Sequence, residues 1–147
     1  MAKTPKPKRP KTAWELCERV CEAIQAHPLN YYQDYFVARR GGSLPEALDT
    51  PANACGTAYC RAGWMVVIAD GADWCESYRD RACELLGMKR WQINDTTSEI
   101  CRLFGAWLNG PTPGTKAYVR RGVSGLRRFM TKHEAHLRAH RLPPRPR

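Results

Sequence analysis

Apolar residues recur at helical spacing where the proline-rich start of the chain ends. In residues 12–28 they form one stripe, and Thr12 and Glu15 stand in the positions of a capping box. Pro28 cannot continue a helix, so it marks the end of the segment. The pattern predicts a first helix whose buried face carries Trp14, Cys17, Cys21 and Ile24.

The segment RAGWMVVIAD, residues 61–70, is apolar without a clear period. Its valines and isoleucine suit a buried strand as well as a helix. Thr57 is placed to cap a helix start, and Gly71 suits the left-handed position just past a helix end. We therefore favour a helix here and keep a buried strand as the alternative.

Three further segments are predicted to be amphipathic helices. The first lies in residues 72–87 and closes at Gly87, and the second, in residues 96–110, begins with another capping box. The third covers residues 115–140, and its apolar seam consists of Val119, Val123, Leu126, Met130, His133 and Leu137. No pair of segments shows the alternation and turn of a hairpin, so the predicted fold is all-α, a compact bundle of about five helices.

Positive charge is concentrated at the two ends of the chain. The net charge of the 147 residues is +10, yet residues 12–114 hold 9 basic and 13 acidic residues. Residues 1–11 hold five cations and no acid, and residues 115–147 hold ten cations against one acid. We expect a disordered basic arm over residues 1–11, a single helical domain over residues 12–140, and a disordered basic Pro/Arg tail over residues 141–147.

This charge distribution favours nucleic acid or a nucleoprotein as the partner. Lys and Arg side chains release counterions from phosphates, which gives an affinity that depends on salt and little on base sequence. Trp91, Tyr118 and the Tyr31–Tyr32 pair are candidates for stacking on bases. The predicted nucleic-acid-binding residues are Lys3, Lys6, Lys8, Arg9, Lys11, Arg120, Arg121, Arg127, Arg128 and Lys132.

The stretch CGTAYCRAGW, residues 55–64, combines two cysteines with a glycine turn. Gly56 allows an unusual backbone conformation, and Cys60 and Trp64 share a helical face at i and i+4. We favour a structural role, because free cysteine is usually buried and the redox spacing C-x-x-C is absent here. Reactive thiol chemistry is one alternative. Another is a zinc site that joins these cysteines to a second pair, either Cys17 with Cys21 or Cys75 with Cys83.

The order of features around this stretch resembles that of an uncharacterised family of small bacterial and phage proteins with the motif C-G-T-x-x-C-x-A-G-W. The matching positions are Cys55, Gly56, Thr57, Cys60, Ala62, Gly63 and Trp64. The resemblance covers about residues 13–131. It implies an architecture and a phage or mobile-element origin, and it implies no common activity. Arg61 departs from the pattern, since an apolar residue is expected at its position.

No enzyme signature is present in the sequence. There is no phosphate-binding glycine loop, no G-x-S-x-G and no H-E-x-x-H. We therefore expect a protein that is not an enzyme, without catalytic residues, cofactor or resident metal. His133, His136 and His140 lie near one helical face, but in an arginine-rich helix this pattern is more typical of a solvated face than of a ligand set.

Cysteine usage and hydropathy indicate the compartment. The chain has seven cysteines and no export signal, which is typical of reduced thiols in a cytoplasmic protein. Its longest apolar run, residues 64–69, is far shorter than the roughly 18 residues of a membrane span, so no membrane partner is expected. We expect a small cytoplasmic accessory protein that binds nucleic acid or a nucleoprotein. The second hypothesis is a protein-interaction module that modulates a host complex through the seam of the last helix or the aromatic cluster in residues 31–36.

Overall fold

The computed structural model describes residues 8–28, 37–38, 58–59, 61–71, 78–88, 111 and 114–146. Within these residues the helices are α1 (Ala13–Ala26), α2 (Arg61–Asp70), α3 (Tyr78–Leu86), α5 (Lys116–Lys132) and α6 (Glu134–Ala139). The short strands β1 (Val37–Ala38) and β2 (Ala58–Tyr59) pair antiparallel, with Val37 opposite Tyr59. The predicted all-α bundle is confirmed. The segment predicted as a helix in residues 96–110 lies outside the described residues.

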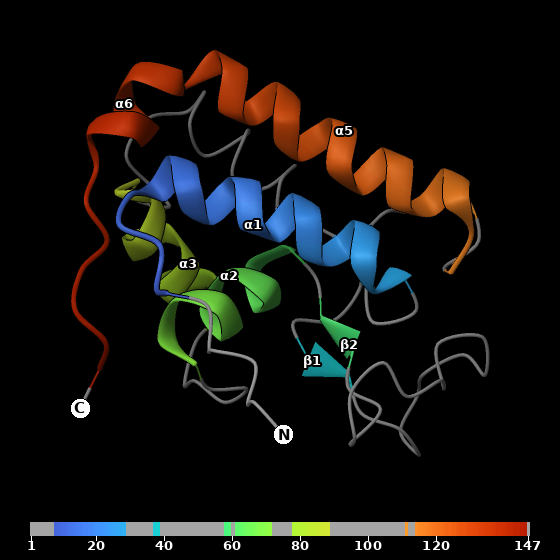
Figure 1. Ribbon diagram of the computed structural model, residues 1–147, viewed down its shortest axis with the longest axis horizontal. Coiled ribbons are helices and arrows are strands. Elements are labelled where there is room, and N and C mark those ends of the chain that lie inside the picture. The colour runs from blue at the N-terminus through green and yellow to red at the C-terminus, as the bar shows by residue number, and fades with distance from the viewer. Residues whose placement is uncertain are drawn as a thin grey trace, which may run out of the picture.

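Helix α1 is the centre of the bundle. Figure 1 shows α5 along one side of α1, with α2 and α3 on the other side. Six residues of α1 are buried, so its apolar stripe is wide enough to contact both neighbours: Ala13, Leu16, Cys17, Val20, Cys21 and Ile24. They belong to one core cluster that also includes residues of α2, α3, α5 and α6. A single core therefore holds the described helices together.

The start of α1 has the predicted cap. The backbone N–H of Glu15 donates to Thr12 Oγ1 at 3.2 Å. The Glu15 carboxylate accepts from the backbone N–H of Lys11 at 2.9 Å, one residue before the cap. The N–H of Glu15 is one of the groups that a helix start leaves without partners, and the Thr12 side chain satisfies it, while Glu15 bonds the N–H of the residue before the cap.

Helix α2 confirms the helical interpretation of residues 61–70 and corrects its start. Ala58 and Tyr59 are in strand β2, and the helix begins only at Arg61. The predicted capping role of Thr57 is therefore wrong, because an extended pair separates it from the helix. The predicted stop at Gly71 is confirmed: its φ is +72°, and its N–H donates to the carbonyl of Val67 at 2.9 Å.

The segment predicted as one helix over residues 115–140 is two helices. α5 begins after Thr115, whose Oγ1 accepts from the N–H of Tyr118 at 3.2 Å. His133, with φ −115° and ψ 26°, separates α5 from α6. The chain changes direction at His133, and this brings His136 of α6 and the C-cap residue His140 to the end of α3. His136 Nε2 lies 2.9 Å from the carbonyl oxygen of Leu86, and His140 Nε2 lies 3.2 Å from that of Glu84.

These two histidines are structural. Carbonyl oxygens accept hydrogen bonds, so the facing ring nitrogens of His136 and His140 are the donors. The two rings also stack, with centroids 5.7 Å apart. The last carbonyls of a helix have no partner within the helix, and His136 supplies one for the carbonyl of Leu86. The carbonyl of Glu84 accepts from the N–H of Gly87 at 3.1 Å as well as from His140. The expected solvated face is confirmed for His136, which is exposed, but the rings of His136 and His140 also bond backbone carbonyls of α3.

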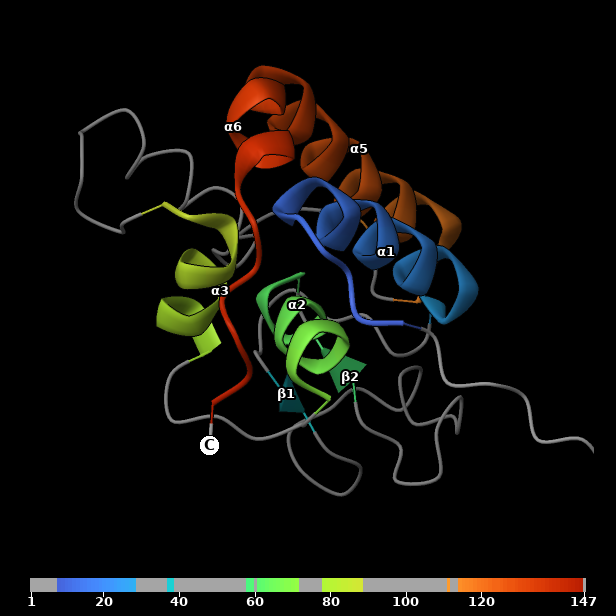
Figure 2. The ribbon, with the colours of Figure 1, turned by 60° about the vertical axis from the view of Figure 1, so that its left-hand side comes forward.

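The predicted disorder of the arms does not extend to residues 8–11 and 141–146. Thr12 and Arg141 form an antiparallel bridge, and the N–H of Leu142 donates to the carbonyl of Lys11 at 3.0 Å. The N–H of Ala13 donates to the carbonyl of His140 at 2.9 Å. Figure 2 shows the C-terminal segment running from α6 down between α3 and α2. Residues 1–7 lie outside the described part of the chain.

Candidate nucleic-acid interface

Helix α5 carries the most concentrated positive charge among the described helices. Its sequence, KAYVRRGVSGLRRFMTK, has six cations and no acid. All six side chains are exposed: Lys116, Arg120, Arg121, Arg127, Arg128 and Lys132. By contrast, α1 has three acids and one cation, with Glu15, Glu18 and Glu22 exposed. Of these two neighbouring helices, α5 is therefore strongly positive and α1 is negative.

The apolar seam of α5 turns these cations away from the core. Tyr118, Gly122, Val123, Leu126, Phe129 and Met130 are buried. Five of the predicted nucleic-acid-binding residues therefore lie on one solvent-facing surface, and Lys116, which sequence reasoning left out, lies there too. Arg121 and Lys132 also have an interaction within the protein.

The cations of α5 form two rows. At about 100° per residue, Lys116, Arg120 and Arg127 fall on one side of the exposed face. Arg121, Arg128 and Lys132 fall on the other side, about 120° around the helix axis. Between the rows lie three small exposed residues, Ala117, Ser124 and Thr131. We call this surface, the two rows with their small midline, the basic face of α5.

The other predicted binding residues divide into three groups. Lys8 and Lys11 are exposed on the segment before α1. Lys3 and Lys6 lie outside the described residues. Arg9 makes contacts within the fold: its Nε donates to the carbonyl of Ala69 at 2.7 Å, and its Nη2 donates to that of Pro143 at 2.5 Å. Arg9 is therefore held within the fold and is not part of the candidate interface.

Arg9 belongs to an ionic cluster that sequence reasoning missed. Arg81 makes a two-pronged contact with Asp70, with Nε 2.7 Å from Oδ2 and Nη2 3.0 Å from Oδ1. The side chains of Arg81 and Asp70 are only 10% and 6% exposed. Arg81 also donates to the carbonyl of Pro144 at 3.0 Å, and Arg145 donates to that of Ala69 at 3.1 Å. The cluster therefore fixes the C-terminal segment to the end of α2 and to the first half of α3.

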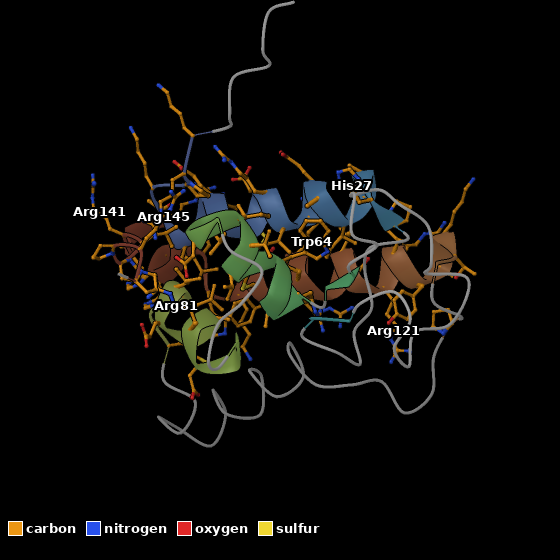
Figure 3. All side chains as sticks on the ribbon, turned by 90° about the horizontal axis from the view of Figure 1, so that it is seen from below. His27, Trp64, Arg81, Arg121, Arg141 and Arg145 are labelled. Carbon is orange, nitrogen blue, oxygen red and sulfur yellow. The ribbon has the colours of Figure 1, made fainter. Side chains whose placement is uncertain are left out.

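The electrostatics of the cluster explain its composition. The carboxyl end of a helix carries partial negative charge, and Asp70 adds a full charge at the end of α2. The hydrogen bond from Arg81 to Asp70 raises the pKa of Arg81, although burial opposes its charge. Figure 3 shows Arg81, Arg141 and Arg145 at one end of the molecule and Arg121 far from them. The tail arginines are thus separate from this part of the basic face of α5.

The described aromatic residues do not supply a stacking surface on α5. Tyr118 is 3% exposed and Phe129 is 7% exposed, so both rings belong to the core. The prediction that Tyr118 stacks on bases is therefore wrong. Trp91, Tyr31 and Tyr32 lie outside the described residues. Trp64, 8% exposed, stacks against His27 with ring centroids 6.1 Å apart.

Arg61, the departure from the motif, is buried beneath α5. It is 3% exposed, and its Nη1 lies 3.5 Å from the carbonyl oxygen of Gly122. A Cβ at Gly125 would lie 2.7 Å from the same nitrogen, so the missing side chain makes room for the guanidinium. Gly122 and Gly125 lie inside α5, where glycine lowers the stability of the helix. They mark the place where the Arg61 guanidinium approaches the backbone of α5.

The cysteines of the described residues are buried thiols. Cys17 and Cys21 are 0% exposed and Cys83 is 4% exposed. Cys55 and Cys60 of the motif, like Cys75 and Cys101, lie outside the described part, so the zinc pairings stay predictions without a structural test. Within the described ranges no three His, Cys, Asp or Glu residues are grouped as a metal site would require.

Burial affects the ionisation of two thiols of α1. It raises the pKa of Cys21 from 9.0 to about 11, although the positive charges of Arg127 and Arg61 oppose the increase. Burial likewise raises the pKa of Cys17, and the neighbouring Cys21 and Glu18 act in the same direction. A thiolate is the reactive form of cysteine, so both side chains are poor nucleophiles near neutral pH.

The raised pKa of Cys21 predicts a loss of stability in alkali. Between pH 9.0 and about 11 the thiol ionises in the unfolded chain and stays protonated in the fold. The unfolded state then binds fewer protons, so the free energy of unfolding should fall by up to about 1.4 kcal/mol per pH unit. Urea unfolding under reducing conditions measures this slope. We expect a shallower slope above pH 9.0 for Cys21→Ala, whereas parallel curves for the two proteins would contradict the assignment.

Comparison of the chain with known protein families, curated proteins and solved structures finds no match. Its similarity to the family with the C-G-T-x-x-C-x-A-G-W motif therefore stays a prediction. No helix in the described ranges has the length and apolar character needed to cross a membrane.

Proposed function

We propose that this protein binds nucleic acid, or a nucleoprotein through its nucleic acid, as a small accessory protein without enzymatic activity. The observation that supports the proposal is the basic face of α5, where six exposed cations are accompanied by no acid on the same helix. Such a surface releases counterions when it meets a polyphosphate, which is the main source of affinity in nonspecific binding. Lys8 and Lys11 add charge outside α5.

The exposed acids of α1 limit how the partner lies. Glu15, Glu18 and Glu22 repel phosphates, so the partner contacts α5 on the side that faces away from α1. Arg127 still lies close enough to α1 for its charge to lower the pKa of Cys21 against the larger effect of burial. The resemblance to phage and bacterial proteins adds a phage or mobile-element origin to the proposal.

The second hypothesis, a protein-interaction module for a host complex, has less support. The seam of α5 was one of its two contact surfaces, and that seam is used inside the fold. Leu126 is 0% exposed and Met130 is 3% exposed. The aromatic cluster of residues 31–36 lies outside the described residues. A specific observation favours the nucleic-acid partner, and none among the described residues favours the second hypothesis.

The salt dependence of binding tests the proposal. For the full-length protein and a labelled DNA duplex, six phosphate contacts predict about a 10³-fold loss of affinity between about 50 and 200 mM salt. Fluorescence anisotropy across that range gives the slope of log affinity against log salt. An acidic polypeptide of similar charge is the control for simple ion exchange. Absence of binding to both DNA and RNA at the lowest salt concentration would rule out the proposal.

A further inference from the structure

The basic face of α5 has the dimensions of a double-helical groove. Each row of cations covers eleven residue steps, from Lys116 to Arg127 and from Arg121 to Lys132, which is about 16 Å along the axis. A helix with its side chains is about 10–12 Å wide, and the major groove of B-form DNA is about 12 Å wide. Two phosphate backbones border that groove, and the helix has two rows of cations.

The midline between the rows is shaped for close approach. Ala117, Ser124 and Thr131 are exposed and small, and they are seven residues apart, so they stay on one line of the helix. The large side chains are on either side of this line. The rows are centred about 60° to each side of it, so they point sideways as well as outward. A helix with this profile can enter a groove and place its cations against both walls.

From these observations we infer that α5 lies in the major groove of B-form duplex DNA, with one row of cations on each phosphate backbone and the small midline toward the base edges. The inference rests on the proposed function, since it names the class of nucleic acid that the basic face of α5 binds. It differs from a general attraction to polyphosphate, because a general attraction needs neither two rows nor a small midline.

Other nucleic acids fit this face less well. Single strands are held by bases stacked on aromatic rings, and the aromatic residues of α5, Tyr118 and Phe129, are buried. The major groove of A-form RNA is deep and too narrow for side chains to enter. The major groove of B-form DNA, by contrast, is wide enough to admit an α-helix, and binding there does not depend on stacked aromatic rings.

The midline residues also indicate how strongly binding depends on the base sequence. Thr131 Oγ1 donates to the carbonyl of Arg127 at 3.0 Å, so its hydroxyl hydrogen is used within the helix. Ala117 offers a methyl group, and Ser124 offers a hydroxyl that bonds several kinds of base edge. No side chain on the midline makes the bidentate contacts that distinguish one base pair from another. The expected binding is therefore selective for duplex form and weakly selective for sequence.

Four probes of equal length test the inference with the full-length protein at one fixed salt concentration. They are a DNA duplex, the same duplex with a bulky sugar on C5 of its cytosines, a DNA single strand and an RNA duplex. The sugar fills the major groove and leaves the number of phosphates unchanged. We expect the unmodified duplex to bind tightest in fluorescence anisotropy, with each other probe at least about tenfold weaker.

The outcomes separate this inference from the proposed function. Equal affinity for the plain and the sugar-bearing duplex would overturn groove binding and leave nucleic-acid binding in place, as would tighter binding of the single strand or the RNA. Absence of binding to every probe would overturn the proposed function itself. A fifth result comes from two glutamine variants, one at Lys116, Arg120 and Arg127 and the other at Arg128, since Arg121 and Lys132 each have an interaction within the protein. The first variant should reduce the salt slope by about 2.7 and the second by about 0.9, and no change in either one would contradict contact with both backbones.

Discussion

Replacement of Arg81 with leucine is expected to lower the free energy of unfolding by about 3 kcal/mol. The substitution leaves the carboxylate of Asp70, whose side chain is 6% exposed, without the partner that contacts both of its oxygens. It also removes the donor to the carbonyl of Pro144. Arg9 Nη2 lies 3.6 Å from Asp70 Oδ1 and partly compensates, so we place the loss at the lower end of the range for broken buried pairs. Urea unfolding gives the value.

Arg138→Leu is the matched control for this prediction. Arg138 also bonds an acid, with its Nε 3.0 Å from Glu134 Oε2, but the two side chains are 55% and 51% exposed. An exposed pair of this kind contributes about 0–1 kcal/mol, and the stacking of Arg138 over Trp14 adds a contribution of similar size. Equal losses of the free energy of unfolding for the two variants would show that burial does not increase the contribution of the Asp70–Arg81 pair to stability. The double variant Asp70→Leu/Arg81→Leu should recover part of the loss, because it removes the isolated charge.

Local signals in the sequence were sufficient to predict the ends of helices that have caps. Thr12 with Glu15 predicted the start of α1, and Gly71 predicted the end of α2, because both depend on backbone groups within a few residues. Val119 and His133 of the predicted seam are only partly buried, but the burial of Val123, Leu126 and Met130 followed from its spacing. The break at His133 did not, because it depends on where the end of α3 lies.

The ionic cluster could not be predicted in the same way. Asp70 and Arg81 are neighbours only once α2 and α3 pack together, and Pro143 and Pro144 belong to a segment whose composition is typical of disorder. The local sequence around a charged residue in a proline-rich stretch does not indicate which residue it will contact. The position of Arg61 had a weak signal, since two glycines inside α5 lower helix stability without an evident local reason.

Sequence reasoning placed Arg9 in one binding set with the cations of α5, and the structure separates them by use. Arg9, Arg81 and Arg145 bind carbonyls and a carboxylate inside the fold. The cations of α5 are exposed, and α5 itself contains no acid, although Arg121 and Lys132 each also have an interaction within the protein. Net charge alone does not make this distinction. The division makes a sharp test possible, because exposed cations at two places can be removed in equal number.

Neutralising four cations of α5 is expected to weaken nucleic-acid binding by at least about 10³-fold at about 0.1 M salt and to reduce its salt slope by about 3.6. The substitutions, all to glutamine, are at Lys116, Arg120, Arg127 and Arg128. These side chains are exposed, and glutamine is a good helix former, so the fold should keep its stability within about 0.5 kcal/mol. Arg121 and Lys132 are left unchanged because each has an interaction within the protein. Anisotropy with a DNA duplex measures affinity and slope together.

The matched control removes four exposed cations from the rest of the described surface. Its substitutions, also to glutamine, are at Lys8, Lys11, Arg138 and Arg141. Both variants change the net charge of the protein by the same amount, so a long-range attraction would weaken equally in the two. Contact between α5 and the phosphates predicts a much larger effect for the α5 variant, since counterions are released only where cations and phosphates meet. Equal salt slopes for the two variants would mean that the affinity depends on total charge, and the basic face of α5 would then not be the binding surface.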